Sequence, residues 1–340
     1  MGRRAFWLGV LLCACVACGA CGADGKDPAD STPSGPPVAA ELPDPVTADT
    51  ATRVKLDDRS QKSWVLGGGP DWMESAFGSL WVWTEVGDVL RIDPGNGRVV
   101  TTIPTVDSNN APRCVGFGAD KESIWRCTGE DQLVRIDART EQPGKSLTVS
   151  KVTDQSRLVA TEHGLWVLAA NGQSVSAIDA EGRKRATVEL GMFCTNMSRG
   201  GGSAIWVLCA SSDAVLKIDP AKKEVVKSVG LDFPRHAAIA DDLWISFAEG
   251  VAQIDTTTLK VKAVYDVARG DTSIWADDDS VWARGDDEQF LVRIDPTAQQ
   301  VTEIVETSDL LGLGDVVVAG GSVWATAEEQ GVLVQLPARP

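Results

Sequence analysis

Histidine is nearly missing from this 340-residue chain, which contains only His163 and His236. The chain also lacks the Gly-x-Ser-x-Gly, His-Glu-x-x-His and phosphate-loop motifs, and its few histidines and cysteines do not show the spacing of zinc ligands. These absences argue against a serine hydrolase, a zinc peptidase or a P-loop nucleotide-binding protein, and we expect no bound metal.

Positive charge is also in short supply. The chain has 32 lysines and arginines against 48 aspartates and glutamates, for a net charge of −16. Binding to nucleic acid requires a basic face, so we do not expect a nucleic-acid partner. After the N-terminal region, no segment is both apolar and long enough to cross a bilayer.

The N-terminal residues have the pattern of an export signal. A positively charged start is followed by a short apolar run over residues 5–14. The sequence Leu-Leu-Cys-Ala-Cys resembles a bacterial lipobox, in which Cys15 would be lipidated and become the new N-terminus. Cys18 and Cys21 are weaker candidates, because each has Cys where the motif has Leu, and a secretory signal cut near Ala20 is the alternative. Both interpretations predict export, and the first anchors the protein to a bacterial membrane, on its periplasmic or extracellular face in the cell envelope.

Three regions follow along the chain. Residues 1–15 are the expected signal peptide, residues 16–58 a disordered linker, and residues 59–340 the folded domain. The linker is rich in Pro, Ala, Asp, Ser and Thr and has almost no large apolar residues, so it cannot bury enough surface to offset the cost of ordering. The N-terminal lipid would then be the only contact with a membrane.

One tryptophan recurs seven times, at intervals of about 40 residues, which is the period of a propeller blade. The seven are Trp81, Trp125, Trp166, Trp206, Trp244, Trp282 and Trp324. Six of them are followed by an Ile-Asp step, at Asp93, Asp137, Asp179, Asp219, Asp255 and Asp295. Such a repeat of short strands predicts an all-β, seven-bladed β-propeller.

Each repeat predicts a blade of four antiparallel strands. In the first copy, residues 74–77, 80–83, 89–93 and 99–103 are β-prone or flank the tryptophan, and an Asp-Pro-Gly turn joins the last two. One Trp per blade at a single register indicates packing between blades rather than a ligand platform. The repeated Asp is likewise interpreted as a turn residue rather than as a catalytic carboxylate.

The seventh copy ends without its outermost strand. Residues 61–67 match the outer-strand segments and precede the first inner strand. We therefore expect this N-terminal strand to pair with residues 331–336 and close the ring, which removes an exposed edge and favours a monomer.

Four cysteines lie outside the signal region: Cys114, Cys127, Cys194 and Cys209. Four cysteines allow three pairings, and export permits disulfides. Relative to the local tryptophan, the first two and the last two have the same summed position, which facing residues of antiparallel strands share. The register therefore predicts Cys114–Cys127 and Cys194–Cys209.

Propellers bind ligands at the mouth of the central channel, where the inner strands begin. Alignment on the tryptophans places a polar set at this mouth: Trp72, Arg113, Arg157, Asn196, Arg235, Asp271 and Asp315. Convergent polar residues at a concave opening predict a ligand-binding site. In the alternative interpretation, the arginines pair with Asp271 and Asp315 and only organise the rim. His236 is the only histidine at a mouth position, and it is the candidate catalytic residue.

The repeats, above all GSLWVWTEVGDVLRIDPGNGRVVTTIP, resemble the bacterial seven-bladed YncE-like and streptogramin-lyase-like (virginiamycin B lyase) propellers over roughly residues 60–340. The segment LWVWTE looks like the "LWFTE" phrase of the lyases. The resemblance implies that lyase members open a cyclic depsipeptide by elimination, with a histidine base, a nearby glutamate and bound Mg²⁺. In this chain His236 would be that base, and Mg²⁺ would be a cofactor only under this alternative.

Two functions are therefore expected. The first is an exported, lipid-anchored propeller that binds a protein partner or a small-molecule ligand at the channel mouth and is not an enzyme. The second is a carbon–oxygen lyase that uses His236, the one mouth histidine where the lyases present more than one.

Overall fold

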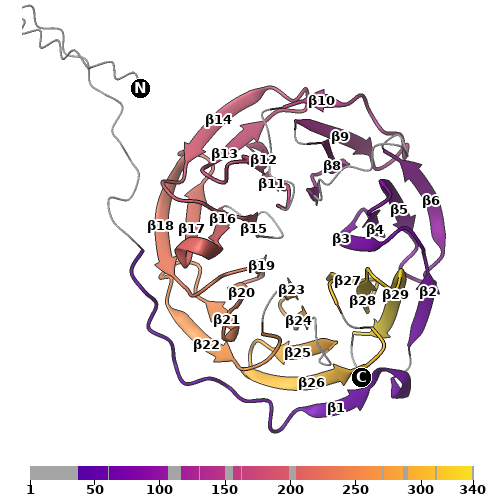
Figure 1. The fold of residues 1–340 in the computed structure, drawn as a ribbon, viewed down its shortest axis with the longest axis vertical. Helices are drawn as coiled ribbons and strands as arrows, with labels where there is room; N and C mark the ends of the chain where they lie inside the picture. The colour runs from indigo at the N-terminus through magenta and orange to yellow at the C-terminus, as the bar shows by residue number, and fades with distance from the viewer. Residues whose placement is uncertain are drawn as a thin grey trace, which may run out of the picture. The chain divides into compact units, whose positions relative to one another are not determined.

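The computed structural model describes residues 37–59, 61–105, 116–129, 131–149, 156–161, 163–198, 204–269, 272–285, 290–310 and 312–338. These residues form a seven-bladed β-propeller, in which seven sheets are arranged around a central axis (Figure 1). Within each blade the strands are antiparallel and follow one another from the centre outward. The predicted fold class is confirmed.

The first three blades each have four strands. Blade 1 has β3 (Pro70–Ala76), β4 (Ser79–Thr84), β5 (Asp88–Ile92) and β6 (Val99–Pro104). Blade 2 has β7 (Phe117–Ala119), β8 (Ser123–Gly129), β9 (Gln132–Asp137) and β10 (Leu147–Thr148), and blade 3 has β11 (Val159–Thr161), β12 (Gly164–Leu168), β13 (Ser174–Ile178) and β14 (Lys184–Glu189).

The remaining blades follow the same plan. Blade 4 has β15 (Asn196–Met197), β16 (Ile205–Cys209), a 3-10 turn η2 (Ala210–Ser212), β17 (Ala214–Asp219) and β18 (Glu224–Gly230). Blade 5 has β19 (His236–Ile239), β20 (Leu243–Phe247), β21 (Gly250–Ile254) and β22 (Val261–Tyr265). Blade 6 has β23 (Ser273–Ala276), β24 (Val281–Arg284), β25 (Leu291–Asp295) and β26 (Gln300–Glu306), and blade 7 has β27 (Val316–Ala319), β28 (Ser322–Ala327) and β29 (Val332–Pro337).

The repeated tryptophans pack between neighbouring blades, as predicted. All seven are at most 2% exposed. Trp81 of blade 1 belongs to one apolar cluster with Phe117 and Ile124 of blade 2, and Trp324 of blade 7 packs with Met73 of blade 1. Burial of such large side chains is a main source of stability, so the period of the sequence is the period of the core.

The repeated aspartates shape the turns between the third and fourth strands. Asp93 Oδ1 accepts a hydrogen bond from the Gly95 amide at 2.8 Å, and Asp137 Oδ1 accepts from the Thr140 amide at 2.7 Å. The side chain thereby holds its own backbone two or three residues on, which is the turn role that the sequence predicted.

An N-terminal strand completes the last blade. β2 (Lys62–Val65) pairs antiparallel with β29, with Lys62 opposite Gln335 and Val65 opposite Val332. Trp64 on this strand stacks on Trp324, with ring centroids 5.4 Å apart. The predicted closure of the ring is confirmed.

Residues 37–58 differ from the expected linker. In Figure 1 this segment runs along the outer strands of blades 4, 5 and 6 before it reaches β2. It bonds to two outer strands, with the Ala40 amide 2.9 Å from the Gly230 carbonyl and the Val46 amide 2.7 Å from the Val264 carbonyl.

Residues 37–59 are called the strap below. The strap ends in β1 (Thr52–Lys55), which pairs parallel with β26, and a 3-10 turn η1 (Leu56–Asp58). Backbone groups of the outer strands order the strap, so its low apolar content did not reveal its structure. The first part of the expected linker, residues 16–36, and the signal region with Cys15 lie outside the described residues.

One predicted disulfide lies entirely within the described residues. Cys194 and Cys209 are bonded, with an S–S distance of 2.03 Å, and they join the start of blade 4 to its second strand. Cys127 is also disulfide-bonded, and its predicted partner Cys114 lies outside the described residues. None of the helices in the described part of the chain is long and apolar enough to span a bilayer.

Candidate functional site

Arg157 crosses the channel mouth and joins three blades. The side chain, which immediately precedes the inner part of blade 3, is only 5% exposed. Its Nη2 lies 2.9 Å from Asp315 Oδ2 of blade 7, and its Nη1 lies 3.4 Å from Glu74 Oε1 of blade 1. The guanidinium also covers the Trp72 ring at 4.4 Å. A single buried cation therefore ties opposite sides of the ring together.

Asp315 is the acceptor at the centre of this network. The residue has no exposed surface. Its Oδ2 accepts from the Met73 amide at 2.8 Å as well as from Arg157, and its Oδ1 accepts from the Val316 amide at 2.9 Å and from the Ser273 hydroxyl. Because both carboxylate oxygens already have protein donors, Asp315 and its partner Arg157 form a closed arrangement.

Asn196 links blade 3 to blade 5 on the same rim. Its Oδ1 accepts from the Arg157 amide at 3.2 Å, and its Nδ2 donates to the Arg235 carbonyl at 3.2 Å. The His236 ring lies beside it, with Nδ1 3.5 Å from Asn196 Nδ2. The Arg235 guanidinium lies 4.6 Å from the Phe233 ring centroid.

The electrostatics of the mouth follow from burial and proximity. Burial alone would lower the pKa of Arg157, but the nearby charges of Asp315 and Glu74 outweigh it and raise that pKa. Burial, followed by the charges of Glu328 and Asp315, raises the pKa of Asp71 well above its usual range. Arg157 is therefore a permanent cation, and the carboxyl group of Asp71 releases its proton less readily than a solvent-exposed carboxyl group.

A second carboxyl group beside the mouth has a perturbed pKa. Burial, a hydrogen bond with Glu85 and the charges of Glu85 and Glu329 raise the pKa of Glu328 to about 7. These residues lie on the β4–β5 and β28–β29 connections of adjoining blades. The rim at blades 7 and 1 is therefore acidic, and the pKa of its Glu328 carboxyl group lies near neutrality.

The structure brings together Trp72, Arg157, Asn196 and Asp315 from the predicted set, and it places Arg235 and His236 beside Asn196. For Arg157 it supports the second interpretation, since this arginine pairs with Asp315. Arg113 and Asp271 lie outside the described residues. Alignment of the repeats placed Glu74 at the same entry position as Trp72, but Glu74 was not included in the predicted site, and Ser273 was not identified.

The described mouth does not fit an Mg²⁺ site. A divalent ion needs carboxylate oxygens that are free to coordinate it. The oxygens of Asp315 are taken by protein donors, and Glu74 faces Arg157. Within the described ranges, no group of three His, Cys, Asp or Glu side chains is arranged to hold a metal ion.

Exposed apolar side chains lie on connections at the mouth end of the propeller. Phe193, Phe233 and Leu313 lie on the connections that lead into the inner strands of blades 4, 5 and 7, and Val86 lies on a hairpin at the same end. They are 46%, 43%, 51% and 52% exposed, respectively. Phe233 has a φ of 48°, a left-handed conformation that is unusual for a bulky residue. The backbone therefore holds an aromatic ring toward solvent at some conformational cost.

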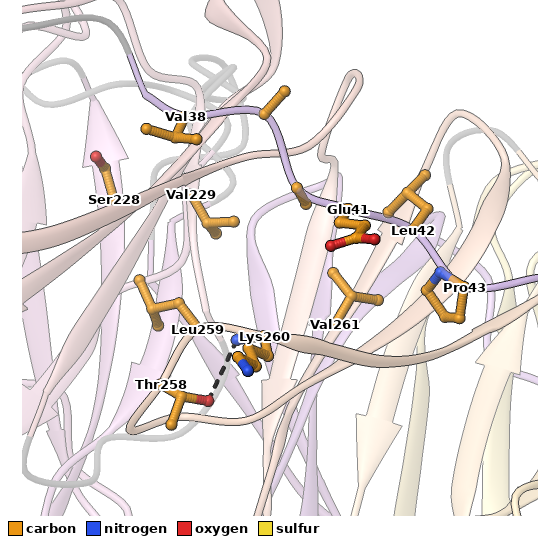
Figure 2. A pocket seen from close by; sticks show the side chains of 12 residues that line it. Val38, Glu41, Leu42, Pro43, Ser228, Val229, Thr258, Leu259, Lys260 and Val261 are labelled. Atoms are coloured by element: carbon orange, nitrogen blue, oxygen red, sulfur yellow. Dashed lines mark hydrogen bonds between the residues drawn. The ribbon is translucent and has the colours of Figure 1, made fainter.

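Two hollows of the described surface lie away from this mouth. One is a groove of about 460 Å³. It lies between the strap at Val38 and Leu42 and the outer edge of blades 4 and 5, at Val229, Val261 and the turn residue Leu259 (Figure 2). A second hollow of about 400 Å³ lies between blades 5 and 6 and is lined by polar residues that include Asp242 and Lys262. Neither hollow contains a residue of the predicted site.

Solved structures with this architecture include two lyases. The chain is similar to a catalytically inactive variant of virginiamycin B lyase from Staphylococcus aureus with quinupristin, at 14% identity and a TM-score of 0.68, over 82% of this chain and 99% of that chain. It is similar to a streptogramin B lyase at 15% identity and a TM-score of 0.67, over 81% and 96% of the two chains. It is also similar to hydrazine synthase from Kuenenia stuttgartiensis, at 15% identity and a TM-score of 0.60, over 84% and 98%.

No protein-family model matches the chain, and no curated protein matches it. Proteins of different activities share this architecture, so the similarity establishes the fold and leaves the activity open. The chain has the propeller fold of the streptogramin lyases, as the resemblance of its repeats indicated.

Proposed function

We propose that this propeller is a binding protein that holds a protein partner or a small-molecule ligand over the channel mouth. The observation that carries the proposal is the set of exposed apolar side chains, Val86, Phe193, Phe233 and Leu313, on connections at the mouth end of the propeller. Apolar side chains gathered on one face mark interaction sites, because their burial against a ligand is favourable.

The polar network beneath these side chains supports binding. Arg157 is held by Asp315 and Glu74 of other blades, so the floor of the mouth is rigid before any ligand arrives. A preorganised site loses less conformational entropy on binding. The acidic rim near Glu85 and Glu328 favours ligands that present a positive or neutral group.

The pairing of the mouth carboxylates favours binding over elimination. The closed pairing of Asp315 and Glu74 with Arg157 does not supply ligands for the cation that a lyase mechanism would use.

Export and lipidation at Cys15 belong to the same proposal. The charged start and the lipobox-like sequence support it, and so does the Cys194–Cys209 disulfide, since disulfides persist in oxidising compartments. Metabolic labelling with a radioactive fatty acid tests the anchor: label should enter the protein and be lost in Cys15→Ser. Label retained in that variant would assign the anchor elsewhere.

A ligand screen with a matched pair of variants tests the mouth. Compounds, cationic peptides and cell-wall fragments that raise the melting temperature identify ligands. Phe233→Asn should abolish the shift, because it removes the exposed ring, and Asn tolerates the left-handed backbone. Phe77→Asn is the control: Phe77 has a φ of 55° and is 38% exposed, but it lies on the β3–β4 hairpin at the opposite end of the channel. Equal loss in both variants would contradict binding at the mouth.

The lyase alternative is tested by turnover. A streptogramin B compound incubated with the protein and Mg²⁺ should remain a closed ring. If the wild type opens the ring and His236→Ala does not, while the control His163→Ala does, then the protein is a lyase and the binding proposal fails.

A further inference from the structure

Arg126 lies between blades 1 and 2, outside the Arg157 network. It has no exposed surface, and its guanidinium lies 5.3 Å from the centroid of the Trp83 ring. Its Nη1 donates to the Gly87 carbonyl and to Thr105 Oγ1 of blade 1. Blade 1 therefore fixes one end of this guanidinium.

The other edge of the guanidinium has no acceptor in the described part of the chain. Nε and Nη2 of Arg126 are buried and make no hydrogen bond, and the same is true of Trp83 Nε1 and Thr128 Oγ1. Thr128 lies two residues beyond Arg126 on β8, at the point where the pairing of β8 with β9 shifts register. Three neighbouring side chains thus carry buried hydrogen-bonding groups that no described residue satisfies.

Burying a cation that no carboxylate contacts costs free energy, and this cost lowers the pKa of the cation. Burial lowers the pKa of Arg126 to about 9, and the charge of Asp88 opposes the change only in part. Other buried arginines are supplied with acceptors. Arg157 has Asp315, and Arg284 donates to three backbone carbonyls. Arg126 differs from both, so an acceptor from outside the described residues accounts for it best.

The positions of Nε and Nη2 of Arg126 indicate what kind of acceptor would fit them. Nε and one terminal nitrogen form the side edge of a guanidinium, which receives both oxygens of a carboxylate in two parallel hydrogen bonds. We propose that Arg126, Trp83 and Thr128 form a binding site for a small carboxylate between blades 1 and 2. The indole N–H and the hydroxyl add further hydrogen bonds, and the bonds of Nη1 orient the guanidinium in advance.

Thermal unfolding in acetate tests this site. Sodium acetate replaces sodium chloride at constant ionic strength, and a parallel series uses sodium phosphate. Acetate should raise the melting temperature of the wild type in a saturable manner, because a ligand of the native state stabilises it. Arg126→Met should lose this response whatever its own melting temperature. Arg284→Met, the control for a buried arginine with protein acceptors, should keep it.

A second readout does not depend on the folding of the Arg126 variant. The indole N–H resonance of Trp83, identified by its loss in Trp83→Phe, should move downfield as acetate is added to the wild type. No acetate response, a response that survives in Arg126→Met, or a larger response to phosphate overturns the carboxylate assignment.

Discussion

Replacing Asp315 by Asn tests the claim that one carboxylate locks the channel mouth. The change keeps the size of the side chain but turns one oxygen into an NH₂ group, which donates. Each oxygen of Asp315 accepts from two protein donors, and at least one of the two is an N–H group that cannot accept, so either orientation of the amide sets a donor against a donor. The buried Arg157 also loses its nearest counter-charge, at 2.9 Å.

The expected cost is large. Removing one partner of a buried ion pair costs about 3–5 kcal/mol, because the remaining charge stays buried without compensation. A neutral buried donor left without an acceptor costs about 1–3 kcal/mol, so the loss of the counter-charge is the larger contribution. For a domain of this size, the melting temperature should fall by about 2–4 °C for each kcal/mol.

Urea unfolding of the wild type and the variant, followed by tryptophan fluorescence, measures the difference. Glu306→Gln is the matched control, since this carboxylate pairs with Arg53 at 2.6 Å while both side chains are at least 38% exposed. An exposed pair contributes about 0–1 kcal/mol, so the control should unfold almost as the wild type does. Equal and small effects in both variants would refute the reasoning about Asp315.

Three other predictions concern the ring and its rim. Deleting residues 61–66 removes β2 and exposes the edge of β29, so the domain should self-associate, and a monomer by light scattering would contradict the closure argument. Because the pKa of Glu328 is raised from 4.5 to about 7, its protonated form contributes stability that is present below pH 4.5 and lost as the pH rises through 7. Urea midpoints should therefore fall over this range, and less so in Glu328→Gln. Replacing Cys194 and Cys209 by Ser should cost about 3 kcal/mol, since the bridge closes a loop of 15 residues; denaturation curves that coincide with those of the wild type would exclude this.

The fold could be predicted because the same residue types occupy the same core and turn positions in each repeat. A Trp at one register and an Asp at the following turn recur in the sequence, and each does the same thing in the structure, as at Trp81 and Asp93. The strap could not be predicted in this way. Its order comes from backbone hydrogen bonds to outer strands, such as Ala40 to Gly230, which leave no trace in side-chain composition.

The mouth was only partly predictable. Alignment of the repeats identified which residues lie at the start of the inner strands, and it placed Arg157 and Asp315 on one rim. It could not say which residues pair, because Arg157 and Asp315 are 158 residues apart and meet only across the channel. The unsatisfied edge of Arg126 had no signal at all, since an arginine on a strand gives no indication of whether acceptors surround it.

The strap and β2 have a consequence for the order of events in folding. Arg53 contacts Glu306, which lies 253 residues later in the sequence, and β2 pairs with β29, the last strand that the structure describes. β1 and β2 therefore cannot find their partners until β26 and β29 have been synthesised. Contacts between such distant parts form slowly, because the closure of a long loop precedes any gain from pairing. During that interval β2 carries unpaired backbone groups, so a chain that crosses a membrane with its N-terminus first would need another partner for this strand until β29 emerges.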